Sequence, residues 1–278
     1  MKVFITYGDS GYRLAKSRIT EQAESTGQFQ QIYACGREDL SPELLASDVI
    51  KIKRGGGLWS WKPDIILSAM EKLNDGDIIV YCDAGCTVYH SREWEEYWKI
   101  LSKCDIIAQR IFQQSYKWTR REIVDFFASN HNGWLKCYQY QATPIFRNTP
   151  FSRHFVREWR DLIIQHPEFI MDVSEEDINN QLPGFIENRH DQAIFSALVY
   201  KYLSSPNTKH LIYTQWEHVE DYDLLHKQAI RATRLRKGEE ERFIDKVIKV
   251  IKRIIKDFFL KPFYYAPRQW WYSRKIIK

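Results

Sequence analysis

Residues 77–85 read DIIVYCDAG, a run of apolar side chains that ends in an aspartate, an alanine and a glycine. An apolar run of this length is typical of a strand that is buried on both faces of a parallel sheet. Asp83 is then expected at the carboxyl end of that strand. In open α/β sheets ligands bind at this edge, so the position of Asp83 predicts a functional site.

Strand-like and helix-like segments alternate on both sides of this run. Residues 2–7 (KVFITY) predict a first strand, residues 14–25 a helix and residues 31–35 a second strand, which together make a β-α-β unit. The later periodicity predicts helices over 64–73, 91–101, 119–128, 150–165 and 188–203 and a strand over 105–110. It also predicts a strand pair or one long strand over 138–148 and a loop over 168–187. The sequence therefore predicts an α/β fold.

A second motif, RGGGLWSWKP at residues 54–63, precedes the Asp83 strand. Its three glycines permit close backbone approach to a ligand and positive φ angles, with Gly56 at their centre. Arg54 and Lys62 are candidates for pairing with phosphates. Trp59 and Trp61 alternate, so that one ring can pack inward while the other offers a face to a sugar or base. The alternative is a flexible loop anchored by two core tryptophans.

A third motif, His190-Asp191-Gln192, precedes an apolar-striped helix. At a helix N-terminus the dipole keeps Asp191 ionised. An ionised carboxylate facing a sugar would bind its hydroxyls or act as general base on an attacking hydroxyl. The alternative is that Asp191 only caps the helix.

Taken together, the three motifs resemble those of bacterial GT-A-superfamily glycosyltransferases, especially the capsule and lipopolysaccharide types. The likeness spans roughly residues 2–213. It implies a GT-A-like, Rossmann-type mixed sheet flanked by helices and a nucleotide-diphosphate sugar as donor. The implied acceptor is a hydroxyl of a surface glycan or lipid-linked oligosaccharide.

On this basis roles are assigned to individual residues. Asp191 is the candidate catalytic residue, and Gln192 beside it matches Asp-Gln pairs that bind the donor sugar in the resembling enzymes. Gln141 and Thr143 are candidates for the acceptor side. The full donor-side set is Thr6, Arg54, Gly56, Trp59, Trp61, Lys62, Asp83, Gly85 and Gln192.

Asp83 is also the candidate ligand for a divalent metal, Mn²⁺ or Mg²⁺, or else the partner of a ribose hydroxyl. The usual motif of these enzymes is Asp-x-Asp, but Gly85 stands where the second carboxylate would be. Weak metal affinity is therefore expected. The missing carboxylate keeps open an alternative function, a non-catalytic glycan- or membrane-binding protein on a degenerate transferase fold.

The charge of the chain is unevenly distributed. Residues 231–278 carry 15 Lys and Arg against 5 Asp and Glu, a net charge of +10, whereas residues 1–230 carry 26 against 31, a net charge of -5. Such a division predicts a catalytic domain over residues 1–230 and a separate basic tail over 231–278 that meets an anionic surface.

The tail has the pattern of an amphipathic helix. Between residues 243 and 259 the apolar side chains fall on one helical face, and Lys246, Lys249, Lys252, Arg253 and Lys256 fall on the other. Tyrosines and tryptophans follow over residues 263–272, as at a membrane-water interface. Residues 239–278 are therefore expected to lie on an anionic membrane, not to cross it. The alternatives are packing on the catalytic domain or on a second subunit, and the apolar stripe argues against nucleic acid.

The expected location is the cytoplasm, on the inner face of the cytoplasmic membrane. Residues 1–10 enter a strand-like pattern directly, without the apolar run of a secretory signal. The five cysteines are odd in number and mostly in apolar surroundings, which suits reduced core thiols.

Overall fold

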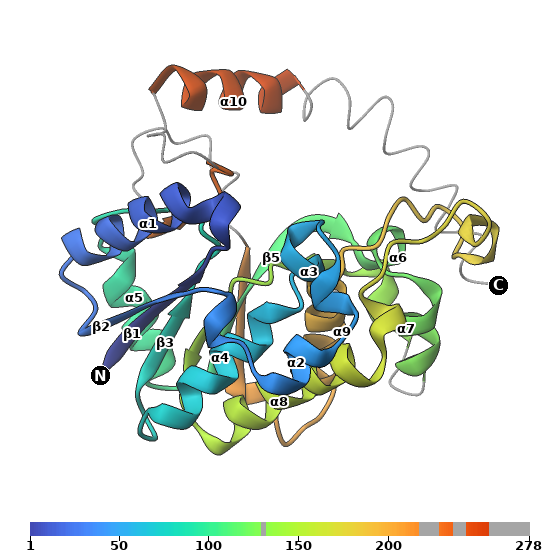
Figure 1. Cartoon of the computed structure of the whole chain (residues 1–278), viewed down its shortest axis with the longest axis horizontal. Coiled ribbons are helices and arrows are strands. Elements are labelled where there is room, and N and C mark those ends of the chain that lie inside the picture. The colour runs from blue at the N-terminus through green and yellow to red at the C-terminus, as the bar shows by residue number, and fades with distance from the viewer. Residues whose placement is uncertain (129–131, 217–227, 236–242, 256–278) are drawn as a thin grey trace.

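The computed structural model describes residues 1–128, 132–216, 228–235 and 243–255 (Figure 1). The strands are β1 (Lys2–Tyr7), β2 (Gln31–Cys35), β3 (Ile78–Tyr81), β4 (Thr87–Val88), β5 (Ile106–Gln114), β6 (Tyr138–Tyr140), β7 (Ile145–Arg147), β8 (Ile212–Trp216) and β9 (Ile230–Arg231). The α-helices are α1 (Arg13–Ser25), α2 (Pro42–Ala46), α3 (Gly55–Leu58), α4 (Trp61–Lys72), α5 (Glu93–Leu101), α6 (Ser115–Trp118), α7 (Arg121–Phe126), α8 (Pro150–Gln165), α9 (Asp191–Leu203) and α10 (Phe243–Ile255).

In the described part of the chain, seven strands form one mixed sheet in the order β2-β1-β3-β7-β5-β6, with β8 beside β5. The pairs β1–β2, β1–β3 and β5–β8 are parallel, whereas β7 is antiparallel to both β3 and β5. Chain order reverses at β1, because β2 lies on one side of it and β3 on the other. Ligands bind at such switch points in α/β sheets.

Alternating side chains of the central strands build a core on each face of the sheet. In β1, Val3 and Ile5 point into the core beneath α4, α8 and α9, and Phe4 points into the core beneath α1 and α5. Ile79 and Val80 of β3 divide in the same way. Figure 1 shows the resulting three layers, with the sheet between two groups of helices. The predicted α/β class, a mixed sheet flanked by helices, is confirmed.

The segment expected to be a long strand or a strand pair over 138–148 is a pair, β6 and β7, separated by residues 141–144. Helix α8 has the predicted bounds because Thr149 caps it, accepting a hydrogen bond from the Ser152 amide at 3.2 Å, and Pro150 occupies the first turn. The predicted loop over 168–187 contains short 3₁₀ turns at Pro167–Phe169 and Ile178–Asn180.

The C-terminal part of the chain contributes two described elements. The expected domain boundary between residues 230 and 231 falls inside β9, which pairs with β4. Helix α10 lies apart from the layered body in Figure 1, and exposes Ile244, Ile248, Ile251, Ile254 and Ile255. No helix among the described residues combines the length and the apolar character needed to cross a bilayer. The predicted aromatic segment at 263–272 lies outside the described residues.

Candidate active site

The glycine motif forms one turn of left-handed helix. All five residues from Gly55 to Trp59 have positive φ angles, between 53° and 102°. The amide of Leu58 donates to the Arg54 carbonyl at 2.8 Å, and that of Trp59 to the Gly55 carbonyl at 3.3 Å. This conformation costs roughly 1–2 kcal/mol for each residue with a side chain. The three glycines lower the total cost of the turn, because they have no Cβ.

The turn sends its two tryptophans in different directions. The ring of Trp61 stacks on Tyr7 of β1, with centroids 4.0 Å apart, and its Nε1 donates to the Gly55 carbonyl at 3.0 Å. Trp59 remains partly buried, with its ring centroid 5.2 Å from that of His190. Trp61 therefore anchors the turn to the sheet, and Trp59 forms part of a wall.

Lys62 connects the motifs that the sequence singled out. Its Nζ lies 2.8 Å from Oδ2 of Asp191 and 3.4 Å from Oδ1 of Asp83. Burial alone would lower the pKa of Lys62, but the attraction of Asp191 and Asp83 outweighs burial, so the pKa is raised. The ammonium group stays charged and ties α4 to the end of β3 and the start of α9.

The two aspartates differ in their access to solvent. The side chain of Asp83 is 38% exposed, against 6% for Asp191, and Oδ1 of Asp83 also accepts a hydrogen bond from the Tyr81 hydroxyl at 2.6 Å. Burial raises the pKa of Asp191 to about 6, although Lys62 opposes the shift. Asp83 is thus the more accessible carboxylate, and Asp191 the one whose charge depends on its partner.

The residue before Asp191 holds an unusual backbone conformation. His190 has φ 51° and ψ -124°, which a residue with a side chain rarely adopts. Its Nε2 lies 3.0 Å from Oδ1 of Asp172, and the same oxygen accepts from Arg54 at 2.5 Å. Asp172 therefore links the glycine turn to the start of α9.

These groups surround a cavity of about 420 Å³ at the carboxyl ends of β1 and β3. A volume of this size is typical of sites for small molecules. Ten of the predicted site residues line it: Arg54, Gly56, Trp59, Trp61, Lys62, Asp83, Gly85, Gln141, Asp191 and Gln192. Thr6 and Thr143 are buried and do not line it.

Gln192 and Gln141 contribute neutral amides to the lining of the cavity. The Nε2 of Gln192 donates to Oε1 of Gln139 at 2.7 Å and to Oε1 of Gln113 at 3.1 Å. The backbone amide of Gln141 donates to the Gln109 carbonyl at 2.8 Å. This wall of amides is neutral and offers both donors and acceptors.

Several residues that line the cavity were not predicted from the sequence. The missed polar and aromatic side chains are those of Tyr7, Asp9, Tyr12, Arg189, His190 and Arg234. Asp9 follows the first strand closely, as Asp83 follows β3, so the strand-end argument would have found it. Arg234 has no comparable local signal.

Arg234 reaches the cavity on a short segment that crosses the Asp83 turn. Strand β9 pairs with β4. Gly85 lies in the turn between β3 and β4. The Gly85 carbonyl accepts from the Thr233 hydroxyl and from the Leu235 amide, each at 3.0 Å. This segment, residues 229–235, therefore forms part of the cavity rim, and the Gly85 carbonyl holds it in place.

Among the described residues, the surroundings of Asp83 do not favour a divalent metal. Asp83 already shares one oxygen between Tyr81 and Lys62. A metal ion bound there would lie beside the Lys62 ammonium group, against its repulsion. In the described ranges there is no group of three or more His, Cys, Asp or Glu side chains placed to bind a metal.

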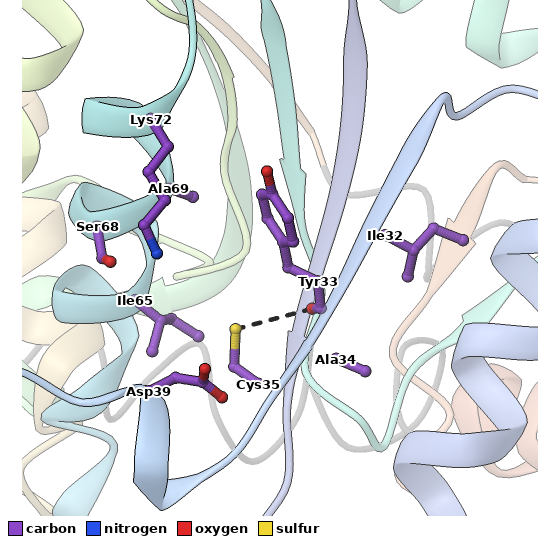
Figure 2. Close-up of a pocket in the computed structure, with 9 residues that line it drawn as sticks. All are labelled: Ile32, Tyr33, Ala34, Cys35, Asp39, Ile65, Ser68, Ala69 and Lys72. Atoms are coloured by element: carbon purple, nitrogen blue, oxygen red, sulfur yellow. Dashed lines mark hydrogen bonds between the residues drawn. The ribbon is translucent and has the colours of Figure 1, made fainter.

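A second cavity, of about 210 Å³, lies between β2 and α4 (Figure 2). Cys35 and Lys72 are among its lining residues, and the Cys35 thiol donates to the Tyr33 carbonyl at 3.8 Å. Burial raises the pKa of Cys35 to about 12, so the thiol is a poor nucleophile. Its size and chemistry make it a weaker candidate than the larger cavity.

The chain is similar to three solved structures. The galactosyltransferase LgtC, solved with donor and acceptor sugar analogues, is 13% identical with a TM-score of 0.37, over 78% of this chain and 87% of that one. Mouse xyloside xylosyltransferase 1 is 10% identical with a TM-score of 0.38, over 79% and 86%. An active-site mutant of LgtC is 16% identical with a TM-score of 0.33, over 65% and 69%.

LgtC and the mouse enzyme are sugar transferases, the class of enzyme that the sequence motifs resemble. At such low identities and TM-scores these similarities carry no argument about function. No protein-family model matches the chain, and no curated protein matches it in sequence.

Proposed function

We propose that this protein is a glycosyltransferase that moves a sugar from a nucleotide-diphosphate donor to a hydroxyl of a surface glycan or lipid-linked oligosaccharide. The observation that carries the proposal is Lys62, buried between Asp83 and Asp191 at the wall of a 420 Å³ cavity. The cavity lies where the strand order reverses, which is the preferred ligand position in this class of fold.

The donor would lie against the glycine turn. In transfer, the bond between the anomeric carbon and the diphosphate oxygen breaks, and the leaving diphosphate keeps the electron pair. An ammonium group has three N–H donors, so Lys62 would contact a phosphate oxygen in addition to the two aspartates with which it forms ion pairs. The proposed role of Lys62 is to stabilise the charge that develops there.

The two carboxylates would contact hydroxyl groups. Asp83, the more exposed, suits a ribose or sugar hydroxyl. Asp191 would either bind the hydroxyls of the transferred sugar or accept the proton of the attacking hydroxyl, and a pKa near 6 suits both tasks at neutral pH. Trp59 and the amides of Gln141 and Gln192 would define the shape of the sugar subsite.

Helix α10 supports a proposed place for the enzyme on the inner surface of the cytoplasmic membrane. Its exposed isoleucines form an apolar face, and lysines of the sequence alternate with them. Such a helix lies in the headgroup region of an anionic bilayer. There it would hold the catalytic domain, residues 1–230, beside a lipid-linked acceptor. Residues 231–235 pack with that domain, so the proposed membrane-contacting tail begins after them.

The test is a panel of nucleotide sugars assayed for release of nucleoside diphosphate, with and without acceptor glycans. We expect one donor to be turned over, and Asp191→Asn and Lys62→Met to abolish turnover. The control is Glu158→Gln, which removes a charge from α8 outside the cavity. Binding of a glycan or vesicle without turnover of any donor would favour the non-catalytic alternative.

A further inference from the structure

Three arginines from separate parts of the chain line the same cavity. Arg54 precedes the left-handed turn, Arg189 precedes His190, and Arg234 lies on the 229–235 segment. They are more than 40 residues apart in sequence, so only the fold brings them together. No sequence motif accounts for their convergence.

Two of these guanidinium groups are fixed in place by neighbours. Nη1 of Arg54 pairs with Asp172 at 2.5 Å, and Nη1 of Arg189 pairs with Glu187 at 3.0 Å. The guanidinium of Arg189 also lies 4.3 Å from the ring centroid of Trp118. A guanidinium has five N–H groups, so each pair leaves donors for a ligand.

Arg234 differs from the other two. Its side chain is exposed, and within the described ranges no acidic side chain pairs with it. Its backbone lies against Gly85, 3.5 Å from the position that a Cβ would take there. That distance is ordinary van der Waals contact, so the backbone that carries Arg234 packs directly on Gly85.

The cations of the cavity differ in how they are balanced. Lys62 is balanced by Asp83 and Asp191. Burial lowers the pKa of Arg189; Glu187 opposes this, and the repulsion of Arg234 and Arg54 lowers the pKa further. Arg189 is therefore close enough to Arg234 and to Arg54 to be repelled by both, and an anion bound beside it would relieve that repulsion.

We propose that Arg54, Arg189 and Arg234 form a cradle for the diphosphate of the donor, so that guanidinium groups neutralise its charge without a divalent metal. The proposal rests on the proposed function, because it takes the ligand to be a nucleotide sugar. Guanidinium binds phosphate oxygens in bidentate fashion and keeps its charge on partial burial. Gly85, which stands where a second carboxylate is missing, holds the Arg234 segment through its carbonyl, which accepts from Thr233 and Leu235.

The experiment is calorimetric titration of the full chain with inorganic pyrophosphate, in EDTA and then in Mg²⁺ or Mn²⁺. We expect binding in EDTA that the metals do not strengthen. Arg234→Gln and Arg189→Gln should each weaken it about tenfold or more, because each removes charge-assisted hydrogen bonds. Arg234→Lys should restore part of the loss.

The matched control is Arg157→Gln, which removes the same charge from an exposed pair with Glu71 on the outside of α8. Its pyrophosphate affinity should equal that of the wild type. The cradle is refuted if pyrophosphate binds only with metal, or if Arg234→Gln binds like Arg157→Gln. Donor turnover in the nucleotide-sugar panel is scored separately. Metal-dependent turnover without metal-free binding would refute the cradle and support the transferase. Metal-free binding of pyrophosphate without turnover of any donor would support the cradle and refute the transferase.

Discussion

Replacing Lys62 with methionine tests the buried charge cluster. The substitution keeps the length of the side chain and removes the cation that lies 2.8 Å from Asp191. At an effective dielectric constant of about 20, that pair interacts by about 6 kcal/mol, and desolvation of both ions offsets part of it. Removing one partner of a buried pair costs roughly 3–5 kcal/mol, because the other charge is left buried alone.

The assay is urea denaturation followed by circular dichroism at pH 8. We expect Lys62→Met to lose roughly 3–5 kcal/mol of unfolding free energy. The double variant Lys62→Met/Asp191→Asn should recover most of it, because no buried charge remains. Lys62→Met/Asp83→Asn is the matched comparison and should recover less, because Asp83 is 38% exposed and water hydrates its charge.

The stability of Lys62→Met should also depend on pH, in a direction set by the pKa of Asp191. Without the lysine, burial raises the pKa of Asp191 in the folded state and nothing at Nζ opposes it. A carboxyl whose pKa is higher in the folded than in the unfolded state stabilises the protein at low pH, and this contribution is lost as pH rises through the folded pKa. Lys62→Met should therefore become more stable from pH 8 to pH 5 relative to wild type. Equal rescue by the two aspartate substitutions, or a loss below about 1 kcal/mol, would refute the reasoning.

The remaining predictions concern the turn, the reaction and the tail. Gly57→Ala should lower the unfolding free energy by about 3 kcal/mol or more, because its Cβ would lie 2.8 Å from a neighbouring backbone atom at φ 102°. Gly56→Ala would meet side-chain atoms only, the nearest being a carboxylate oxygen of Asp9 at 3.3 Å, and should cost only about 1–2 kcal/mol in the same denaturation assay. With an active donor, kcat/KM should fall as pH drops below about 6, where Asp191 becomes protonated, and Asp191→Asn should remove both the activity and this limb of the pH profile. Ile248→Asp should abolish sedimentation with vesicles that contain phosphatidylglycerol, whereas Leu14→Asp, at an even more exposed apolar position on α1, should sediment like wild type.

Local sequence was sufficient for the central strands and for the position of Asp83, although it gave no strand at β8. The run before Asp83 is apolar throughout, and a strand buried on both faces allows few other residues. Asp191 could be placed for a similar reason, because the apolar stripe of α9 begins directly after it. In both cases the signal lies within about ten residues of the functional group, as strand and helix patterns do.

The charge partners could not be predicted in this way. Lys62 was expected to face phosphates, but its Nζ also contacts Asp83 and Asp191, and the second contact joins residues 129 positions apart. Arg234 depends on the pairing of β9 with β4, which is set by the packing of distant segments. No periodic pattern in a single sequence encodes such long-range contacts.

The glycine turn lies between these two cases. Three adjacent glycines predicted positive φ angles, but the conformation continues through Leu58 and Trp59, where a side chain makes it costly. Leu58 is 1% exposed, so burial of its side chain offsets that cost. The sequence indicates where the backbone is free to turn left-handed, and only the packed core shows how far the turn extends.

Two segments that line the cavity and contact one another both contain residues with strained backbone conformations. Trp59 holds its left-handed conformation beside His190, which holds φ 51°, and each such position costs roughly 1–3 kcal/mol. Asp172 joins Arg54 to His190 across the gap, and Lys62 joins the following helix to Asp191. The strained residues are therefore held by contacts within the chain itself. These contacts fix the positions of the Arg54, Lys62 and Asp191 side chains, so little of the free energy of ligand binding is needed to order them.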